Sequence, residues 1–397
     1  MTSEEEKISQ IFRKIAWLDK NRWKQHNGKT DYGLINFSHN DLSNADKILI
    51  HWLCYISDRQ MGFQQIWDKG GYVYSDIVYE YKSKKDTVSL LNPDNSDGFL
   101  KRTPMDGYKF SSKSVVQKNN ILIRNYEYSE GDNVDFTPRY YPSDIKSIMQ
   151  TLIILEEYDK NIISYIAAII DRDEHMLIKK IGFAMYLLAY FNIGQPKGVN
   201  YSKIIMEIKE NKKKVLEILN DNKLFEEEFQ YFLKYLQFNQ KRMWCSLRDY
   251  VKSDDFFPYM ISGFKEIGRD DLIERWKNMN RSELELPGDV WNNNPKFQKC
   301  LFGNIAGLKM NENSSKFIRD VFEKYKHCIV EGYPEMFDVT FDFVPKMCSS
   351  GMCDLCIFNE KNQIEQLCTK DTSKYCPVLL NSCGYISKCD TKECILK

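Results

Sequence analysis

The apolar positions near the N-terminus repeat with the period of an α-helix. Ile8, Ile11 and Ile15 lie at the spacing of one helix face. Ser3 and Glu6, directly before them, match the Ser-x-x-Glu capping box that satisfies unpaired amides at the start of a helix. The sequence therefore predicts an amphipathic helix at the start of the chain.

A second apolar stripe predicts a second helix. Leu49, Trp52 and Ile56 repeat at i, i+3 and i+7. The pair Gly70-Gly71 is a typical stop, because glycine adopts the left-handed conformation in which many helices end. We therefore expect this helix to end before the glycine pair.

The pattern then changes twice. Between about 72 and 142 helical periodicity gives way to Asn, Asp, Ser, Lys and Gly, with short β-forming runs such as Ile121-Leu122-Ile123, so an irregular insertion is predicted. Periodicity resumes at Ser143, which can cap the next helix. Predicted helices then cover 143–158, 160–170, 176–191, 202–219, 224–238, 270–278 and a stretch capped by Ser314 or Ser315 that ends near Tyr325. The pattern as a whole indicates a mainly α fold.

Composition and charge narrow the class of protein. With 397 residues, of which 43% are hydrophobic, the chain can bury one large core or two ordinary ones, which excludes a disordered or fibrous protein. The 56 Lys and Arg balance 56 Asp and Glu, whereas dedicated nucleic-acid-binding domains are usually basic. Any binding of nucleic acid must therefore come from a local patch.

Neither a membrane span nor a secretion signal is expected. The longest mostly apolar stretch, 181–194, has 14 residues and includes Asn192, whereas a spanning helix needs about 20 apolar residues. The first ten residues, MTSEEEKISQ, lack the apolar core of a signal peptide. We expect a cytoplasmic protein, and in that reducing compartment clustered cysteines are more often metal ligands than disulfides.

The cysteines are concentrated at the C-terminal end. Eight of the 12 fall within the last 50 residues, and the first four of these follow the pattern Cys348-x4-Cys353-x2-Cys356-x11-Cys368. The central Cys-x-x-Cys can place two thiolates on one metal ion or on one edge of a cluster. Zinc and an iron-sulfur cluster both accept four thiolates, so the pattern predicts a metal centre and leaves the metal open.

A second group of cysteines is spaced more widely and has no Cys-x-x-Cys. It can form a second metal site, supply substitute ligands to the first site, or consist of structural thiols. The group comprises Cys376, Cys383, Cys389 and Cys394.

Two other kinds of functional motif are missing from the sequence. The five histidines form no His-x-x-x-His pair, and no glycine-rich nucleotide-binding motif stands where a nucleotide fold needs it. The sequence therefore gives no support to a peptidase-type zinc site or a nucleotide-binding fold.

Two further segments accompany the cysteine run. Leu286-Pro287-Gly288-Asp289-Val290-Trp291 is an acidic turn upstream of the cysteines, and Ile48 to Trp67 is a helical segment. With the helical segment first, the acidic turn second and the cysteine run last, these three segments resemble the iron-sulfur, endonuclease III-like branch of the helix-hairpin-helix DNA glycosylase superfamily. The cysteine run keeps the central spacing of the family loop, C-x6-C-x2-C-x5-C, and differs in both outer spacings. The resemblance implies a helical two-lobed fold whose C-terminal loop binds a metal centre.

The resemblance also assigns roles to residues. The ligands of a [4Fe-4S] cluster, with zinc as the alternative, are Cys348, Cys353, Cys356 and Cys368. Asp289 matches the catalytic aspartate, and a helix N-cap is its alternative role. Ser57 and Gln60 match in kind a pair that faces DNA, although Gln60 can equally be an ordinary helix-end glutamine. Lys346, beside the cysteine run, is available to bind a DNA phosphate.

The family hairpin, Leu-Pro-Gly-x-Gly followed in some members by a catalytic lysine, has no clear counterpart before Asp289. Leu286-Pro287-Gly288 can be its remnant, in which case Asp289 lies inside the turn and the next aspartate is Asp320. Lyase chemistry through a lysine Schiff base is not indicated in either arrangement.

The expected domains and functions follow from the resemblance. We expect an N-terminal helix, 1–45, that packs with the C-terminal lobe; a helical lobe, 46–288, with the insertion; and a C-terminal lobe, 289–397, with the cysteine loop. The leading hypothesis is a DNA repair N-glycosylase that flips a nucleotide and excises a damaged or modified base. The second is a DNA-modifying transferase, similar to the α-glutamyl/putrescinyl thymine pyrophosphorylases, which adds an amino acid or polyamine to an activated thymine. The third is a non-catalytic, metal-stabilised DNA-binding module.

Overall fold

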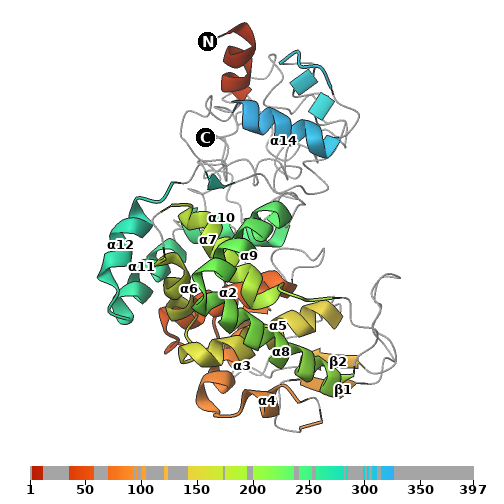
Figure 1. Ribbon diagram of the computed structural model, residues 1–397, viewed down its shortest axis with the longest axis vertical. Helices are drawn as coiled ribbons and strands as arrows, with labels where there is room; N and C mark the ends of the chain where they lie inside the picture. The colour runs from red at the N-terminus through yellow and green to blue at the C-terminus, as the bar shows by residue number, and fades with distance from the viewer. Residues whose placement is uncertain are drawn as a thin grey trace, which may run out of the picture. The chain divides into compact units, whose positions relative to one another are not determined.

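The described part of the computed structural model is mainly helical, which confirms the predicted fold class at that level (Figure 1). The structure describes residues 2–11, 35–57, 70–92, 94–95, 100–103, 120–123, 142–172, 175–194, 200–236, 241–252, 256–280, 283–284, 298–299, 302–303, 306–310 and 314–325. No helix among these residues is both long and apolar enough to cross a membrane.

The chain divides into two compact units. The first, called here the central unit, takes the described residues of 34–235 and 256–279. The second, called the terminal unit, takes those of 1–33, 236–255 and 280–397. The division into domains at 45 and 288 stays a prediction.

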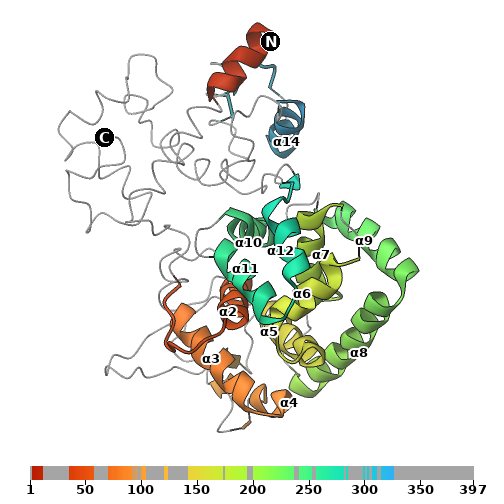
Figure 2. The ribbon, with the colours of Figure 1, turned by 90° about the vertical axis from the view of Figure 1, so that its left-hand side faces the viewer.

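A helix that is buried on every side forms the middle of the central unit. In α2 (Asn44–Ser57), every residue from Ala45 onward except Lys47 is buried. α2 packs against α3 (Gly71–Ser83), α5 (Pro142–Leu155), α6 (Ile162–Ile170) and α11 (Phe256–Glu266) (Figure 2). A helix that is apolar all round is stable only when other elements enclose it, and these four helices do so.

The remaining helices of the central unit lie around this group. They are α4 (Thr87–Leu90), α7 (Leu177–Ala189), α8 (Tyr201–Asn220), α9 (Asn222–Leu236) and α12 (Asp270–Lys277), with a short 3₁₀ turn, η2 (Glu156–Tyr158). α5 packs against α7 and α8, and α11 packs against α12. The helices predicted from 143 to 238 and at 270–278 are therefore confirmed, with ends that differ by a few residues.

A two-stranded antiparallel ribbon lies between α4 and α5 in the sequence. β1 (Leu100–Thr103) pairs with β2 (Asn120–Ile123), with Leu100 opposite Ile123 and Thr103 opposite Asn120. The β-forming run noted within the predicted insertion is therefore a strand.

The helix α2, as described, ends at Ser57, before the glycine pair, but the pair is not the left-handed stop that the sequence suggested, because Gly70 has helical φ and ψ values of −66° and −37°. Gly71 does not end a helix: it begins α3, which lies inside the segment predicted to be irregular. The apolar face of α3 includes Val73, Ile77 and Tyr81, which are buried. Glycine is needed at 71 for space, because a Cβ there would lie 2.4 Å from Ile35 Cγ2 and 2.6 Å from the backbone oxygen of Asn36.

Two predicted caps were also misplaced. The capping box of the N-terminal helix, residues 3–11, starts one residue early: Glu5 N–H donates to Thr2 Oγ1 at 3.2 Å, and Thr2 N–H donates to Glu5 Oε2 at 2.6 Å. Ser143 was predicted to cap the next helix, but α5 begins one residue earlier, at Pro142, since proline suits the first helical position. The buried Ser143 hydroxyl has no hydrogen-bond partner among the described residues, so it does not cap the helix.

The terminal unit contains the N-terminal helix together with α10 (Lys241–Lys252) and α14 (Ser314–Tyr325). α10 was not predicted, whereas α14 confirms the predicted helix at 314–325. Glu4 Oε1 accepts hydrogen bonds from Lys324 Nζ at 3.1 Å and from the Tyr325 hydroxyl, so the start of the chain contacts the end of α14.

We expect Gly71→Ala to destabilise the protein by about 1–3 kcal/mol, because the new methyl group meets a backbone oxygen that cannot move without shifting the chain before α2. Gly194→Ala is the matched control, since a Cβ at 194 has nothing within 4 Å, and we expect its effect to stay within about 0.5 kcal/mol. Denaturant unfolding of the two variants measures both values. Equal stability of the two variants would contradict the close packing at 71.

Candidate functional site

Most of the site residues predicted from the sequence lie outside the described residues. These are Gln60, Asp289, Lys346, Cys348, Cys353, Cys356 and Cys368, together with the four later cysteines of the tail. Asp320, the alternative catalytic aspartate, is exposed on α14. Within the described ranges, no group of three or more His, Cys, Asp or Glu side chains can hold a metal ion.

Ser57 is the one predicted DNA-binding residue that the structure describes, and it is a buried side chain. It is the last residue of α2 and is 0% exposed. Its hydroxyl donates to the backbone oxygen of Leu53 at 2.9 Å and is hydrogen bonded to the Tyr74 hydroxyl of α3. The hydroxyl has no path to a phosphate or a base in this arrangement. Ser57 therefore joins the end of α2 to α3 and has no part in the DNA contact proposed below.

Cys54, also on α2, is fully buried among apolar side chains. Burial raises the pKa of its thiol. A thiol that stays protonated is a poor nucleophile and a poor metal ligand. Cys54 is therefore a core residue, as its isolated place in the sequence suggests.

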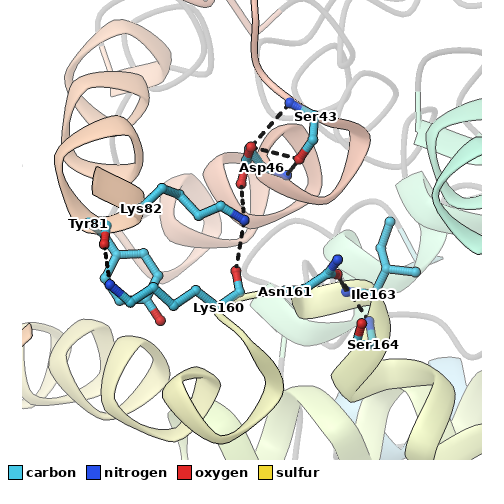
Figure 3. A network of polar contacts seen from close by, with 8 residues as sticks. All are labelled: Ser43, Asp46, Tyr81, Lys82, Lys160, Asn161, Ile163 and Ser164. Carbon is cyan, nitrogen blue, oxygen red and sulfur yellow. Dashed lines mark hydrogen bonds and ion pairs between the residues drawn. The ribbon is translucent and has the colours of Figure 1, made fainter. Parts of the chain in front are cut away.

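A polar network joins three segments of the central unit (Figure 3). At the start of α2, Asp46 Oδ2 accepts hydrogen bonds from the Ser43 amide at 3.1 Å and from its hydroxyl at 2.6 Å. The Asp46 amide donates in turn to Ser43 Oγ at 3.2 Å, which completes a capping box. The other carboxylate oxygen, Oδ1, lies 3.3 Å from Lys82 Nζ at the end of α3.

The second half of the network connects α3 to the turn before α6. Lys160 Nζ donates to the backbone oxygens of Tyr81, at 2.6 Å, and Lys84, and it lies 4.7 Å from the centre of the Tyr81 ring. Lys82 Nζ donates to the backbone oxygen of Lys160 at 3.4 Å. Carbonyls at a helix C-terminus carry the negative end of the helix dipole, so an ammonium group is well placed there. Partial burial lowers the pKa of Lys160, an effect that nearby Glu156 opposes.

The turn itself has a special backbone. Asp159 and Lys160 have positive φ values of 52° and 59°. This left-handed pair turns the chain so that Asn161 can cap α6, where its side-chain oxygen accepts from the amides of Ile163 at 2.9 Å and Ser164 at 3.1 Å. A lysine nucleophile needs an amine that can reach a substrate, whereas this amine points at backbone carbonyls. The network is therefore a joint between helices.

A second cluster lies just before α2. Ser38 Oγ donates to Asp76 Oδ1 at 2.6 Å, and His39 Nε2 lies 2.9 Å from the same oxygen. The His39 ring stacks on Tyr79 with centroids 4.2 Å apart. In a nucleophilic triad the imidazole lies between the hydroxyl and the carboxylate, whereas here both groups share one carboxylate oxygen. The cluster fastens the segment before α2 to α3 and does not activate Ser38.

Comparison of the chain with models of known protein families, with characterised proteins and with solved structures finds no match in any of the three.

We expect Lys160→Met, which keeps most of the aliphatic stem, to destabilise the protein by about 1–2 kcal/mol, because two backbone oxygens lose a charged donor. Thermal and denaturant unfolding measure the loss. Lys85→Met is the control, since Lys85 is exposed one residue beyond the carbonyls that Lys160 binds, and we expect little change. Unfolding of Lys160→Met that matches the control would show that the joint contributes little.

Proposed function

We propose that this chain is a DNA-directed enzyme, related to the helix-hairpin-helix DNA glycosylases, that flips a nucleotide and excises a damaged or modified base. One observation carries the proposal: the Cys-x-x-Cys run near the C-terminal end of the sequence, preceded by the sequence Leu-Pro-Gly-Asp. The mainly helical described structure is compatible with it.

The proposed metal centre uses Cys348, Cys353, Cys356 and Cys368. Four thiolates suit a [4Fe-4S] cluster, and they suit zinc equally well in donor type. When bound, such a centre would cross-link the loop and hold it folded. Lys346, two residues before the first ligand, would then be held near the DNA backbone, where its charge can contact a phosphate.

Asp289 is the proposed catalytic carboxylate. Breaking the N-glycosidic bond leaves positive charge on the sugar, and a fixed carboxylate stabilises this charge and can orient the water that adds to it. Gln60 would fill the gap that the everted nucleotide leaves. It follows Ser57, the last residue of the buried helix α2, by three residues in the sequence.

A second function, transfer of an amino acid or polyamine to an activated thymine in DNA, is favoured by one specific observation. The sequence before Asp289 lacks the Leu-Pro-Gly-x-Gly hairpin and the lysine that follows it in bifunctional glycosylases. A protein that modifies a base without excising it has no need of that lysine. The third function, a metal-stabilised DNA-binding module without catalysis, uses the same cysteine centre and needs a local basic patch, because the net charge of the chain is zero.

The metal is tested first. We expect protein purified without oxygen to contain iron and to show the broad visible absorption of a cluster, and we expect Cys353→Ser/Cys356→Ser to lose both. Cys54→Ala is the control, because Cys54 is a buried core thiol, and it should retain them. Bound zinc without visible absorption would select the alternative metal, and the absence of any metal would contradict the proposed centre.

Catalysis is tested with duplexes that carry damaged or modified bases, and released base is measured by chromatography. We expect Asp289→Asn to lower the rate by at least about 100-fold, as removal of one transition-state-stabilising group typically does. Asp320→Asn, at an exposed aspartate of α14, tests the alternative assignment, and we expect it to leave the rate close to wild type. If Asp320→Asn abolishes release and Asp289→Asn does not, the catalytic assignment is reversed. Addition of an amine to pyrophosphorylated thymine without base release would indicate the transferase, and unaltered DNA would indicate binding alone.

A further inference from the structure

The lysines of α8 fall into two groups with different surroundings. Lys212 is used by the fold: its Nζ lies 3.5 Å from a Glu156 oxygen and 2.6 Å from a Glu157 oxygen. Four other lysines of the helix are exposed, and none of them forms an ion pair with any part of the chain that the structure describes. They are Lys203, Lys209, Lys213 and Lys214, and we call them the basic stripe.

The basic stripe lies on the solvent side of a strongly amphipathic helix. The opposite side, which includes Ile204, Ile208 and Val215, is buried, and α8 packs against α5 on this side. Met206 lies between the stripe lysines and is 71% exposed, which shows how open this face is. Figure 2 shows α8 at the edge of the central unit.

The stripe carries more positive than negative charge. Lys209 and Lys213 are one turn apart, and like charges at this spacing destabilise a helix by about 0.2–0.5 kcal/mol. Glu210 and Glu217 lie on the same face and leave a net charge of plus two, from four lysines and two glutamates. The third glutamate, Glu207, is turned to Lys146 of α5, 2.6 Å away. The stripe therefore presents an excess of two positive charges to the solvent.

We infer that the basic stripe of α8 binds the phosphate backbone of duplex DNA. This inference rests on the proposed function, which requires DNA, and it names a surface for it on the described fold. From Lys203 to Lys214 the helix rises about 16 Å, a length that lies opposite about five phosphates of one strand. A membrane surface fits less well, because an interfacial helix must bury its apolar face in lipid and that face of α8 is already buried in protein.

The test compares two variants of the full chain that lose the same net charge. The stripe variant is K203Q/K209Q/K213Q/K214Q, and glutamine keeps the helix propensity of lysine. The control is K85Q/K223Q/K265Q/K277Q, which neutralises four exposed lysines on other segments. Affinity for a short labelled duplex of mixed sequence is measured over a series of salt concentrations. Circular dichroism and thermal unfolding confirm that both variants are folded.

We expect the stripe variant to bind the duplex at least about tenfold more weakly than wild type at physiological salt. The slope of log affinity against log salt should become less steep by about 0.9 for each lysine that contacts a phosphate. The control should stay close to wild type in both. Equal affinities and slopes for the two variants overturn the inference, and so does stripe-dependent binding to phosphatidylserine vesicles with unchanged duplex binding.

The outcome separates this inference from the proposed function. If wild type releases a base and the stripe variant binds DNA as the control does, the inference fails and the enzyme proposal stands. If binding depends on the stripe but DNA is left chemically unaltered, the inference holds and the enzyme proposal fails. If wild type binds no duplex at all, both fail.

Discussion

The enclosure of α2 is the constraint on which the rest of the described fold depends. A helix with apolar side chains on all sides cannot lie on a surface, so the chain must supply neighbours all round it. α3 and α5 follow in the sequence, whereas α11 comes from a segment some 200 residues later, so the central unit is complete only when distant parts of the chain are in place. The interior is held mainly by burial of large side chains such as Trp52 and Tyr55.

Complete enclosure makes polar groups at the helix ends costly unless they are bonded. In the central unit, side chains of one element form hydrogen bonds with such backbone groups of another element. The Tyr81 hydroxyl donates to the backbone oxygen of Leu152 at 2.8 Å. Between α5 and α8, Asn211 Nδ2 donates to Gln150 Oε1 at 2.7 Å, and both amides reach the backbone oxygen of Phe191. Such bonds add modest net stability, but breaking one leaves a buried group unsatisfied, which is what fixes one arrangement of the helices.

Most of the helices could be predicted from helical periodicity. An amphipathic helix such as α8 has to bury one face, so its apolar residues repeat every three to four positions in the local sequence. α3 was missed because Gly71 was interpreted as a helix stop. The glycine is there because Ile35 and Asn36 pack closely against it, and a contact between segments 35 residues apart leaves no local signal in the sequence. Ser57 gives a similar case: as a serine near a helix end it resembles a DNA-facing residue, whereas its burial and its hydrogen bond to Tyr74 depend on a helix further along the chain. The cysteine run remains a prediction from spacing alone.

The neutral net charge of the chain has a different meaning once the lysines are placed. Lys146 and Lys212 each lie 2.6 Å from a carboxylate, and Lys160 donates to backbone carbonyls. These three ammonium groups are therefore bonded within the central unit and are less available to a partner. The positive charge that a polyanion meets is the excess of exposed lysines over the acidic groups on the same face. Salt screens the interaction between exposed charges that lie more than about 8–10 Å apart. A phosphate is therefore attracted by the charges directly in front of it, and the net charge of all 397 residues has little effect. Net neutrality therefore does not weigh against the proposed DNA partner, because a local surface such as the outward face of α8 is enough for the proposed contact.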